Sequence, residues 1–148
     1  SMSGEQTTNP NSFVDSNLWL YALTHSKTGR DEVKGKRAQE VILSARHALS
    51  TQVIAEVSTN LLRKGIASES EIAELVDDFY REHTVVPIDQ QTFRDGSALR
   101  IRYSFSFWDS LIVATALQSG AETLYSEDMQ HGFVVDGRLR IINPLLQE

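Results

Sequence analysis

The 148-residue sequence contains no cysteine, and this absence excludes several classes of protein at once. Without thiols there is no disulfide framework, thiolate zinc site, iron–sulfur cluster or cysteine nucleophile. The four histidines are scattered without the i, i+4 spacing of a helical zinc site. No apolar run approaches the roughly 20 residues of a membrane helix, and no basic-then-apolar signal peptide pattern is present. We therefore expect a cytoplasmic protein with no membrane association.

Negative charge is unevenly distributed along the chain. The net charge at pH 7 is −6. Residues 69–82 hold six acids and one base, so this segment alone carries −5 and leaves −1 for the remainder. An acidic total therefore does not argue against a nucleic-acid ligand, because the acidity lies mainly on one segment.

The length suits one domain, since chains of this size bury roughly two thirds of the surface exposed when unfolded. Residues 1–12 are polar and aperiodic and contain Pro10, so we expect a disordered tail. A Ser ahead of a Met at its start has the form of a scar from tag removal. Residues 13–148 show no internal repeat and no break in composition, which predicts a single domain.

Short apolar segments alternate with longer amphipathic segments after the tail. We predict strands at 13–15, 48–50, 84–88, 123–125 and 140–142, and helices at 18–23, 30–46, 53–62, 69–82, 90–103 and 108–119. Such alternation predicts an α/β fold with a parallel sheet covered on both faces. Sheets of this kind place their sites at the carboxyl ends of the strands.

Four acidic residues stand where such a sheet would bring them together. Asp15 ends the first predicted strand, and Asp128 follows the strand at 123–125. Glu56 and Asp109 lie beside apolar helical stripes. Each one alone has an ordinary alternative as a helix cap, a turn residue or a solvated surface acid. Their joint placement at one rim is what indicates a site.

A cluster of four carboxylates needs neutralisation. At about 6 Å and an effective dielectric of about 20, each of its six pairs repels by roughly 2–3 kcal/mol. The sum, roughly 15 kcal/mol, rivals the whole stability of a typical domain, so cations or protons must offset it. Oxygen ligands without His or Cys select a hard ion, Mg²⁺ or Mn²⁺. Such ions can bind a phosphodiester and activate water to attack it.

Several motifs together resemble one known family. They are FVDSN at 13–17, TQVIAEV at 51–57, FWDSLIVATALQSGAETLYSED at 107–128 and IINP at 141–144. In their order and spacing they resemble the PIN domain and, more narrowly, the VapC-type toxins of bacterial toxin–antitoxin pairs. The resemblance extends from residue 13 to about residue 144.

The resemblance implies a three-layer α/β/α sandwich with a central parallel sheet, and metal-dependent endonucleolytic cleavage of single-stranded RNA. Asp15, Glu56 and Asp109 match the family's core acids, and Asp128 matches the fourth, although the adjacent Glu127 could share or take that role. The positions expected to support these acids are Ser16, Asn17 and Ser126. A tyrosine often precedes the third acid of the family, and Trp108 stands there in this chain.

The resemblance also implies a homodimer and an antitoxin whose C-terminal segment covers the acidic groove. A second interpretation stays open: a PIN scaffold that binds RNA or protein without cutting, because intact acids permit catalysis without guaranteeing it. A receiver-type phospho-switch is disfavoured, since Asp15 has no acidic neighbour and Lys64 is the last lysine. The pair Phe107-Trp108 favours a place in the core or in a dimer interface over base stacking.

Overall fold

The computed structural model describes residues 9–28 and 32–146, and the first eight residues of the expected tail lie outside that range. The last residues of the segment assigned to the tail belong to the domain. Pro10 is buried, the carbonyl of Asn11 accepts hydrogen bonds from the amides of Glu122 and Thr123, and the first strand begins at Ser12. These backbone hydrogen bonds extend the first strand's pairing toward its N-terminal side.

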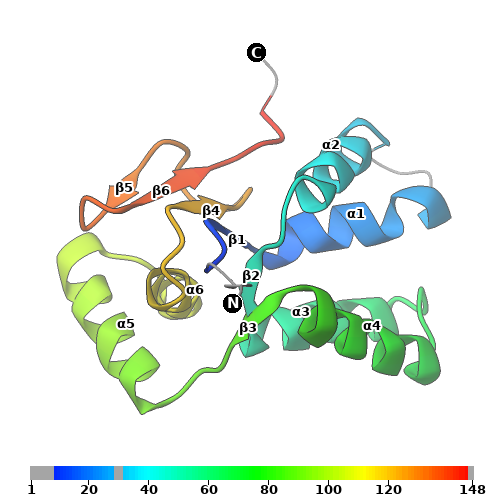
Figure 1. Ribbon diagram of the computed structural model, residues 1–148, viewed down its shortest axis with the longest axis horizontal. Helices are drawn as coiled ribbons and strands as arrows, with labels where there is room; N and C mark the ends of the chain where they lie inside the picture. The colour runs from blue at the N-terminus through cyan, green and yellow to red at the C-terminus, as the bar shows by residue number, and fades with distance from the viewer. Residues whose placement is uncertain (1–8, 29–31, 147–148) are drawn as a thin grey trace, which may run out of the picture.

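Six strands form one central sheet (Figure 1). The strands are β1 (Ser12–Val14), β2 (Ala48–Ser50), β3 (Thr84–Val86), β4 (Thr123–Tyr125), β5 (Val134–Val135) and β6 (Leu139–Ile142). Their order is β3-β2-β1-β4-β6-β5, and every neighbouring pair is parallel except β5 with β6. The predicted parallel sheet is therefore confirmed, with one short antiparallel strand added at its edge. That strand was not predicted, because two residues are too few to show a strand pattern.

Within the described ranges, six helices complete the three layers. They are α1 (Ser16–Thr28), α2 (Glu32–Leu43), α3 (Thr51–Arg63), α4 (Glu69–Glu82), α5 (Gln90–Tyr103) and α6 (Phe107–Gln118). Helices α1–α4 lie on one side of the sheet, and α5 and α6 lie on the other (Figure 1). Right-handed connections produce this division, because the chain first moves outward from β1 to β3 and then crosses to β4 on the opposite side of β1. The predicted α/β/α sandwich is confirmed.

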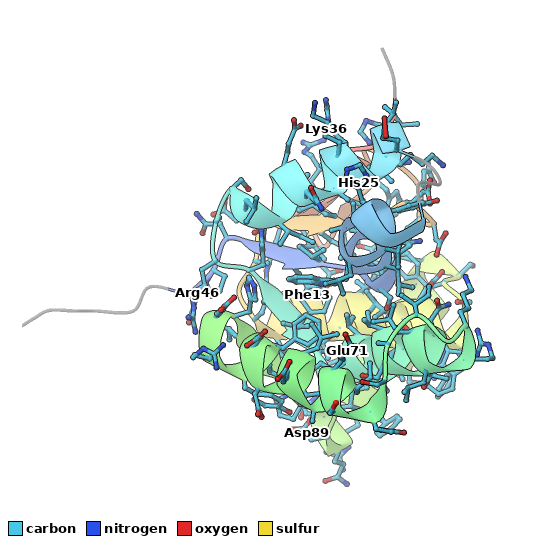
Figure 2. All side chains as sticks on the ribbon, turned by 90° about the vertical axis from the view of Figure 1, so that its right-hand side faces the viewer. Phe13, His25, Lys36, Arg46, Glu71 and Asp89 are labelled. Atoms are coloured by element: carbon cyan, nitrogen blue, oxygen red, sulfur yellow. The ribbon has the colours of Figure 1, made fainter. Side chains whose placement is uncertain are left out.

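The core lies on both faces of the sheet. Phe13 of β1 is fully buried at the centre of the molecule (Figure 2), as is Leu124 of the adjacent β4. Helix α6 is buried along most of its length, from Ser110 to Ala116. A helix that is apolar on nearly all sides is expected at such a central position. No helix among the described residues is long and apolar enough to cross a membrane.

Serine caps fix the starts of the two helices that carry predicted site acids. The Ser50 hydroxyl accepts from the Val53 amide at 3.3 Å at the start of α3. The Ser106 hydroxyl accepts from the Asp109 amide at 3.2 Å at the start of α6. Capping of this kind satisfies amides that lack a partner within the helix. Asp109 is thereby held in the first turn of α6, where the helix dipole favours a negative charge.

Candidate active site

One cleft opens beyond the carboxyl ends of β1 and β2, between α1, α3 and α6. Its volume is about 800 Å³. Asp15, Glu56, Asp109 and Asp128 all line it, each from a different segment of the chain. From β1 the chain proceeds to β2 on one side of the pair, and from β4 it proceeds to β5 and β6 on the other side, so the strand order reverses between β1 and β4. Doubly wound folds open a ligand crevice at such a point.

Asp15 is the most enclosed of the four acids, with 6% of its surface exposed. Its amide donates to the carbonyl of Tyr125 at 2.9 Å, so the residue directly continues the pairing of β1 with β4. One carboxylate oxygen accepts from the Ser16 amide at 2.7 Å and the other from the Ser126 hydroxyl at 2.9 Å. Burial raises the pKa of Asp15 to about 6, against the lowering effect of these two hydrogen bonds. The negative charges of Glu56 and Asp128 raise it further.

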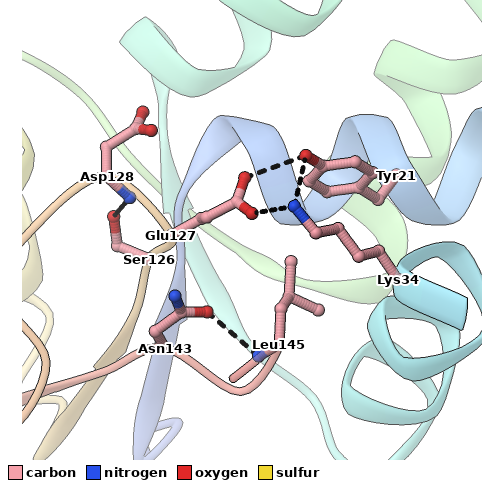
Figure 3. Close-up of polar contacts among 7 residues, drawn as sticks. All are labelled: Tyr21, Lys34, Ser126, Glu127, Asp128, Asn143 and Leu145. Atoms are coloured by element: carbon pink, nitrogen blue, oxygen red, sulfur yellow. Dashed lines mark hydrogen bonds and ion pairs between the residues drawn. The ribbon is translucent and has the colours of Figure 1, made fainter. Parts of the chain in front are cut away.

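Ser126 links two of the acids. Its buried hydroxyl donates to Asp15 and also accepts from the Asp128 amide at 3.2 Å. The loop after β4 is thus hydrogen-bonded to the end of β1, and Figure 3 shows the hydrogen bond between Ser126 and Asp128. The Asp128 side chain is exposed and lines the cleft. The role expected of Ser126 as a supporting residue has this contact as its physical basis.

Glu56 lies in the second turn of α3 with its carboxylate held on both oxygens. The Ser16 hydroxyl donates a short hydrogen bond to one oxygen, and the Gln52 amide nitrogen donates to the other at 3.2 Å. The same Gln52 nitrogen reaches the backbone oxygen of Trp108 at 3.4 Å. Gln52 therefore ties α3 to the start of α6 and orients Glu56 between them.

Asp109 lines the same cleft from α6, which lies on the opposite side of the sheet from α1 and α3 (Figure 1). It is partly buried, and this burial is the largest cause of a raised pKa. A hydrogen bond with the Ser106 side chain lowers the pKa, whereas the charges of Asp128 and Glu56 raise it. The charges of Glu56 and Asp128 thus act on both Asp15 and Asp109, in the direction that disfavours their ionised forms.

Glu127 turns away from the cleft, and it is not among the residues that line it. One of its carboxylate oxygens accepts from the Tyr21 hydroxyl at 2.9 Å, and the other contacts the Lys34 ammonium at 2.7 Å (Figure 3). Hydrogen bonding to the carboxylate helps to raise the pKa of Tyr21, after burial as the main cause. Glu127 thus connects the β4 loop to α1 and α2, and Asp128 is the acid of this pair that faces the cleft.

The remaining predicted supporting residues also lie at the cleft. Ser16 and Asn17 both line it from the first turn of α1. The side-chain oxygen of Asn17 is buried and has no hydrogen-bond partner within the described residues. Buried amide oxygens are normally paired, so this atom has unused capacity to accept a hydrogen bond beside the acids.

Sequence reasoning did not propose two residues that line this cleft. Gln52 and Arg63 line the cleft from the same helix as Glu56, at spacings that share one helical face. That spacing was the available signal for both. Trp108 also lines the cleft and is 60% exposed, and the adjacent Phe107 is 45% exposed. Of the two places expected for this pair, the core is wrong, because both residues lie in the first turn of α6 before the helix enters the interior; the dimer interface stays a prediction.

The donor set of the cleft is suited to a hard divalent ion. Its charged oxygens come from carboxylates, and no histidine lines it. Within residues 9–28 and 32–146, however, no three His, Asp or Glu side chains are already gathered closely enough to hold an ion. The fit to such an ion therefore rests on the chemistry of the four carboxylates, and not on a ligand group already formed among the described residues.

The fold and the cleft together define the class: a doubly wound α/β protein with an acidic site at the switch point of its sheet. The family model of the PIN domain matches residues 12–132. The chain therefore belongs to the PIN domain family. A comparison of the sequence with curated proteins finds no match.

Three solved structures have a similar fold. A chain of a toxin–antitoxin complex from Klebsiella pneumoniae aligns with a TM-score of 0.66 at 18% identity, covering 90% of this chain and 97% of that one. VapC20 of Mycobacterium tuberculosis, a toxin that cleaves the sarcin–ricin loop, aligns at 0.61 and 20% identity, covering 79% and 89%. VapBC2 of Rickettsia felis, bound to a DNA fragment from its promoter, aligns at 0.59 and 14% identity, covering 89% and 98%. At these identities the likeness is one of fold.

Proposed function

We propose that this PIN domain is a metal-dependent endoribonuclease of the VapC type, the toxin of a toxin–antitoxin pair. The observation that supports this most directly is the presence of four carboxylates in one open cleft, where burial and, after it, the charges of neighbouring acids raise the pKa of Asp15 and Asp109. Such repulsion lowers the stability of the fold unless a cation offsets it. Because the arrangement lowers the stability of the fold, stabilisation does not explain it, and binding of a cation does.

Asp15, Glu56, Asp109 and Asp128 would hold one or two Mg²⁺ or Mn²⁺ ions. Such an ion, when bound, polarises the RNA phosphodiester and makes a bound water more acidic. The chain's own contribution is to orient the oxygens. The Ser16 amide and Ser126 hydroxyl fix both oxygens of Asp15, and Ser16 and Gln52 fix both oxygens of Glu56. Ligands fixed in this way lose little freedom when an ion binds.

The same cleft offers a binding surface for a protein inhibitor. Four carboxylates on an open surface attract a cationic segment, and one of the similar folds comes from a toxin–antitoxin complex. We therefore propose a cognate antitoxin that covers the cleft. We further propose that the protein is a homodimer. We also propose that it is located in the cytoplasm with its RNA substrate. Sedimentation of the protein alone and with the antitoxin tests the first two parts.

Cleavage of RNA by the purified full chain is the direct test of the function. We expect a mixed pool of structured and single-stranded RNA to be cut in the presence of Mg²⁺ or Mn²⁺. Adding EDTA should stop the reaction, and excess Mn²⁺ should restore it. Cleavage that persists in EDTA would contradict the metal-dependent mechanism. Tight RNA binding without cleavage under any of these conditions would instead favour a PIN scaffold that acts by binding alone.

The adjacent acids Glu127 and Asp128 make a matched pair of variants. We expect Asp128→Asn to slow RNA cleavage at least tenfold, about 1.4 kcal/mol, because its carboxylate faces the cleft. Glu127→Gln should leave the rate nearly unchanged, since Lys34 and Tyr21 hold that side chain elsewhere. Its effect on stability should be small, because a partly exposed ion pair contributes about 0–1 kcal/mol. Initial rates on one RNA measure both, and the reverse order would assign the fourth acid to Glu127.

A further inference from the structure

Trp108 presents a fixed aromatic surface at one end of the acidic cleft. Its indole contacts the Phe107 ring edge to face, with the centroids 5.3 Å apart. The Arg100 guanidinium in turn lies 4.6 Å from the centre of the Phe107 ring. The backbone oxygen of Trp108 is held by Gln52, as described above. The Trp108 ring thus packs against Phe107, while most of the surface of the residue stays exposed to solvent.

Arg63 lines the same cleft from the last turn of α3. Among the described residues that line the cleft, it is the only one with a positive charge. It has no acidic partner within hydrogen-bonding reach in the described part of the chain, and it lies in the last turn of α3. Gln52, which contacts Trp108, lies in the first turn of the same helix. Gln52 and Arg63 are eleven positions apart, about 16 Å along the helix at 1.5 Å per residue, and Glu56 lies between them on α3.

We propose that Trp108 and Arg63 together hold single-stranded RNA across the acids, with a base stacked on the indole and a backbone phosphate bound by the guanidinium. This inference rests on the proposed function and names how that function binds its substrate. A cleft of four carboxylates repels RNA along most of its length. Stacking supplies affinity that does not depend on charge and accepts any base, and one cation beyond the acids fixes the strand's path.

The chemistry around Trp108 favours RNA over a protein partner as its occupant. Trp108 directly precedes Asp109 in the chain, and the cleft that both residues line also contains apolar residues such as Leu20 and Ile112. Its other walls include Thr59, Asn60 and Arg63, which suit a sugar–phosphate backbone. An apolar protein interface would gain little from those groups. Two other exposed apolar residues, Phe93 and Ile101, belong to α5 and do not line the cleft. A single-stranded RNA bound at the acids therefore contacts Trp108, whereas a protein partner bound on α5 does not have to contact it.

The test measures RNA binding in an Asp15→Asn background, so that cleavage does not interfere. The probe is a short labelled single-stranded RNA of mixed sequence, titrated at several salt concentrations. Trp108→Ala should weaken binding about 5- to 100-fold without changing the dependence of affinity on salt. Arg63→Gln should reduce the slope of log K against log salt by about 0.7, the contribution of one phosphate contact on a single strand. These two signatures separate stacking from charge.

Matched variants outside the cleft provide the controls. Tyr80→Ala removes an exposed aromatic from α4, and Arg94→Gln removes an exposed cation from α5; both should bind as the background protein does. Trp108→Phe should keep most of the affinity because an aromatic face remains. Fluorescence adds a direct readout, since the other tryptophan, Trp19, is buried: RNA should quench emission in the background protein and far less in Trp108→Phe.

The outcomes distinguish this inference from the proposed function. Binding and cleavage that are equal with and without the Trp108 indole would overturn the inference and leave the ribonuclease intact. Equal RNA binding together with a change in sedimentation would assign Trp108 to a protein interface and would also overturn it. Failure of the background protein and of the wild type to bind RNA at all would remove the proposed function, and the inference with it.

Discussion

Asp15→Asn should cut RNA at least about a hundredfold more slowly than the wild type, which corresponds to about 3 kcal/mol of lost transition-state stabilisation. The substitution keeps the shape of the side chain and one acceptor for the Ser16 amide, but it removes the most enclosed of the four charges. A divalent ion that both polarises the phosphate and generates the nucleophile depends on that charge. Initial rates on one RNA, with Mg²⁺ and with Mn²⁺, measure the effect.

RNA affinity should change far less, within about tenfold, because binding comes mainly from Lys and Arg contacts to phosphates. The matched control is Asp77→Asn, which makes the same chemical change on an exposed face of α4. It should cleave as the wild type does. If Asp15→Asn and the wild type cut the same RNA at equal rates, either a contaminating nuclease or another site is responsible, and the mechanism must be abandoned.

In EDTA at pH 7.5, the same Asp15→Asn variant should be more stable than the wild type by up to about 3 kcal/mol. The pKa of Asp15 is raised to about 6 in the folded protein, above its ordinary value of 3.8. Between these two pH values the folded chain keeps a proton that the unfolded chain releases. The free energy of unfolding of the wild type therefore falls as pH rises through this window, by about 1.4 kcal/mol per pKa unit. Replacing the acid removes that loss.

Urea unfolding at a series of pH values checks this, with the stability of the variant compared with that of the wild type at each pH. The difference should be largest above pH 6 and should vanish near pH 4. Adding Mn²⁺ at pH 7.5 should raise the melting temperature of the wild type, because the ion binds the folded state, and should raise that of the variant less. Asp77→Asn should show neither effect. A difference in stability that does not vary with pH would mean that Asp15 is ionised without cost in the folded protein.

Much of the fold could be predicted because its signals are local. The strands β2 and β4 have the predicted bounds, since a short apolar run between turn residues depends on few neighbours. The strand-end rule likewise identified Asp15 and Asp128 before any geometry was known, as parallel strands bring their carboxyl ends to one edge. The short β5 strand was missed, although Asp136 and Gly137 carried a hairpin signal: both have positive φ, as the turn requires.

The residues that sequence reasoning could not assign depend on contacts between distant segments. Lys34 determines which of Glu127 and Asp128 faces the site. It lies in α2, 93 positions before Glu127, and its ammonium binds the Glu127 carboxylate. The core was a wrong prediction for Trp108 for a similar reason. The segment that follows it is strongly apolar, and only the packing of α6 reveals that its first turn remains outside the core.

The amide of Asp15 forms the last backbone hydrogen bond between β1 and β4, so the geometry of the site depends on the pairing of these two strands. The two strands are three residues long, so the acid belongs to the ladder that holds the sheet together. Local opening of that ladder would displace Asp15 and Ser126 at the same moment. Amide exchange at Asp15 therefore reports local opening of the sheet at the cleft. A substitution that loosens Val14 or Leu124 in the core would thus disable the site in a molecule that is still largely folded.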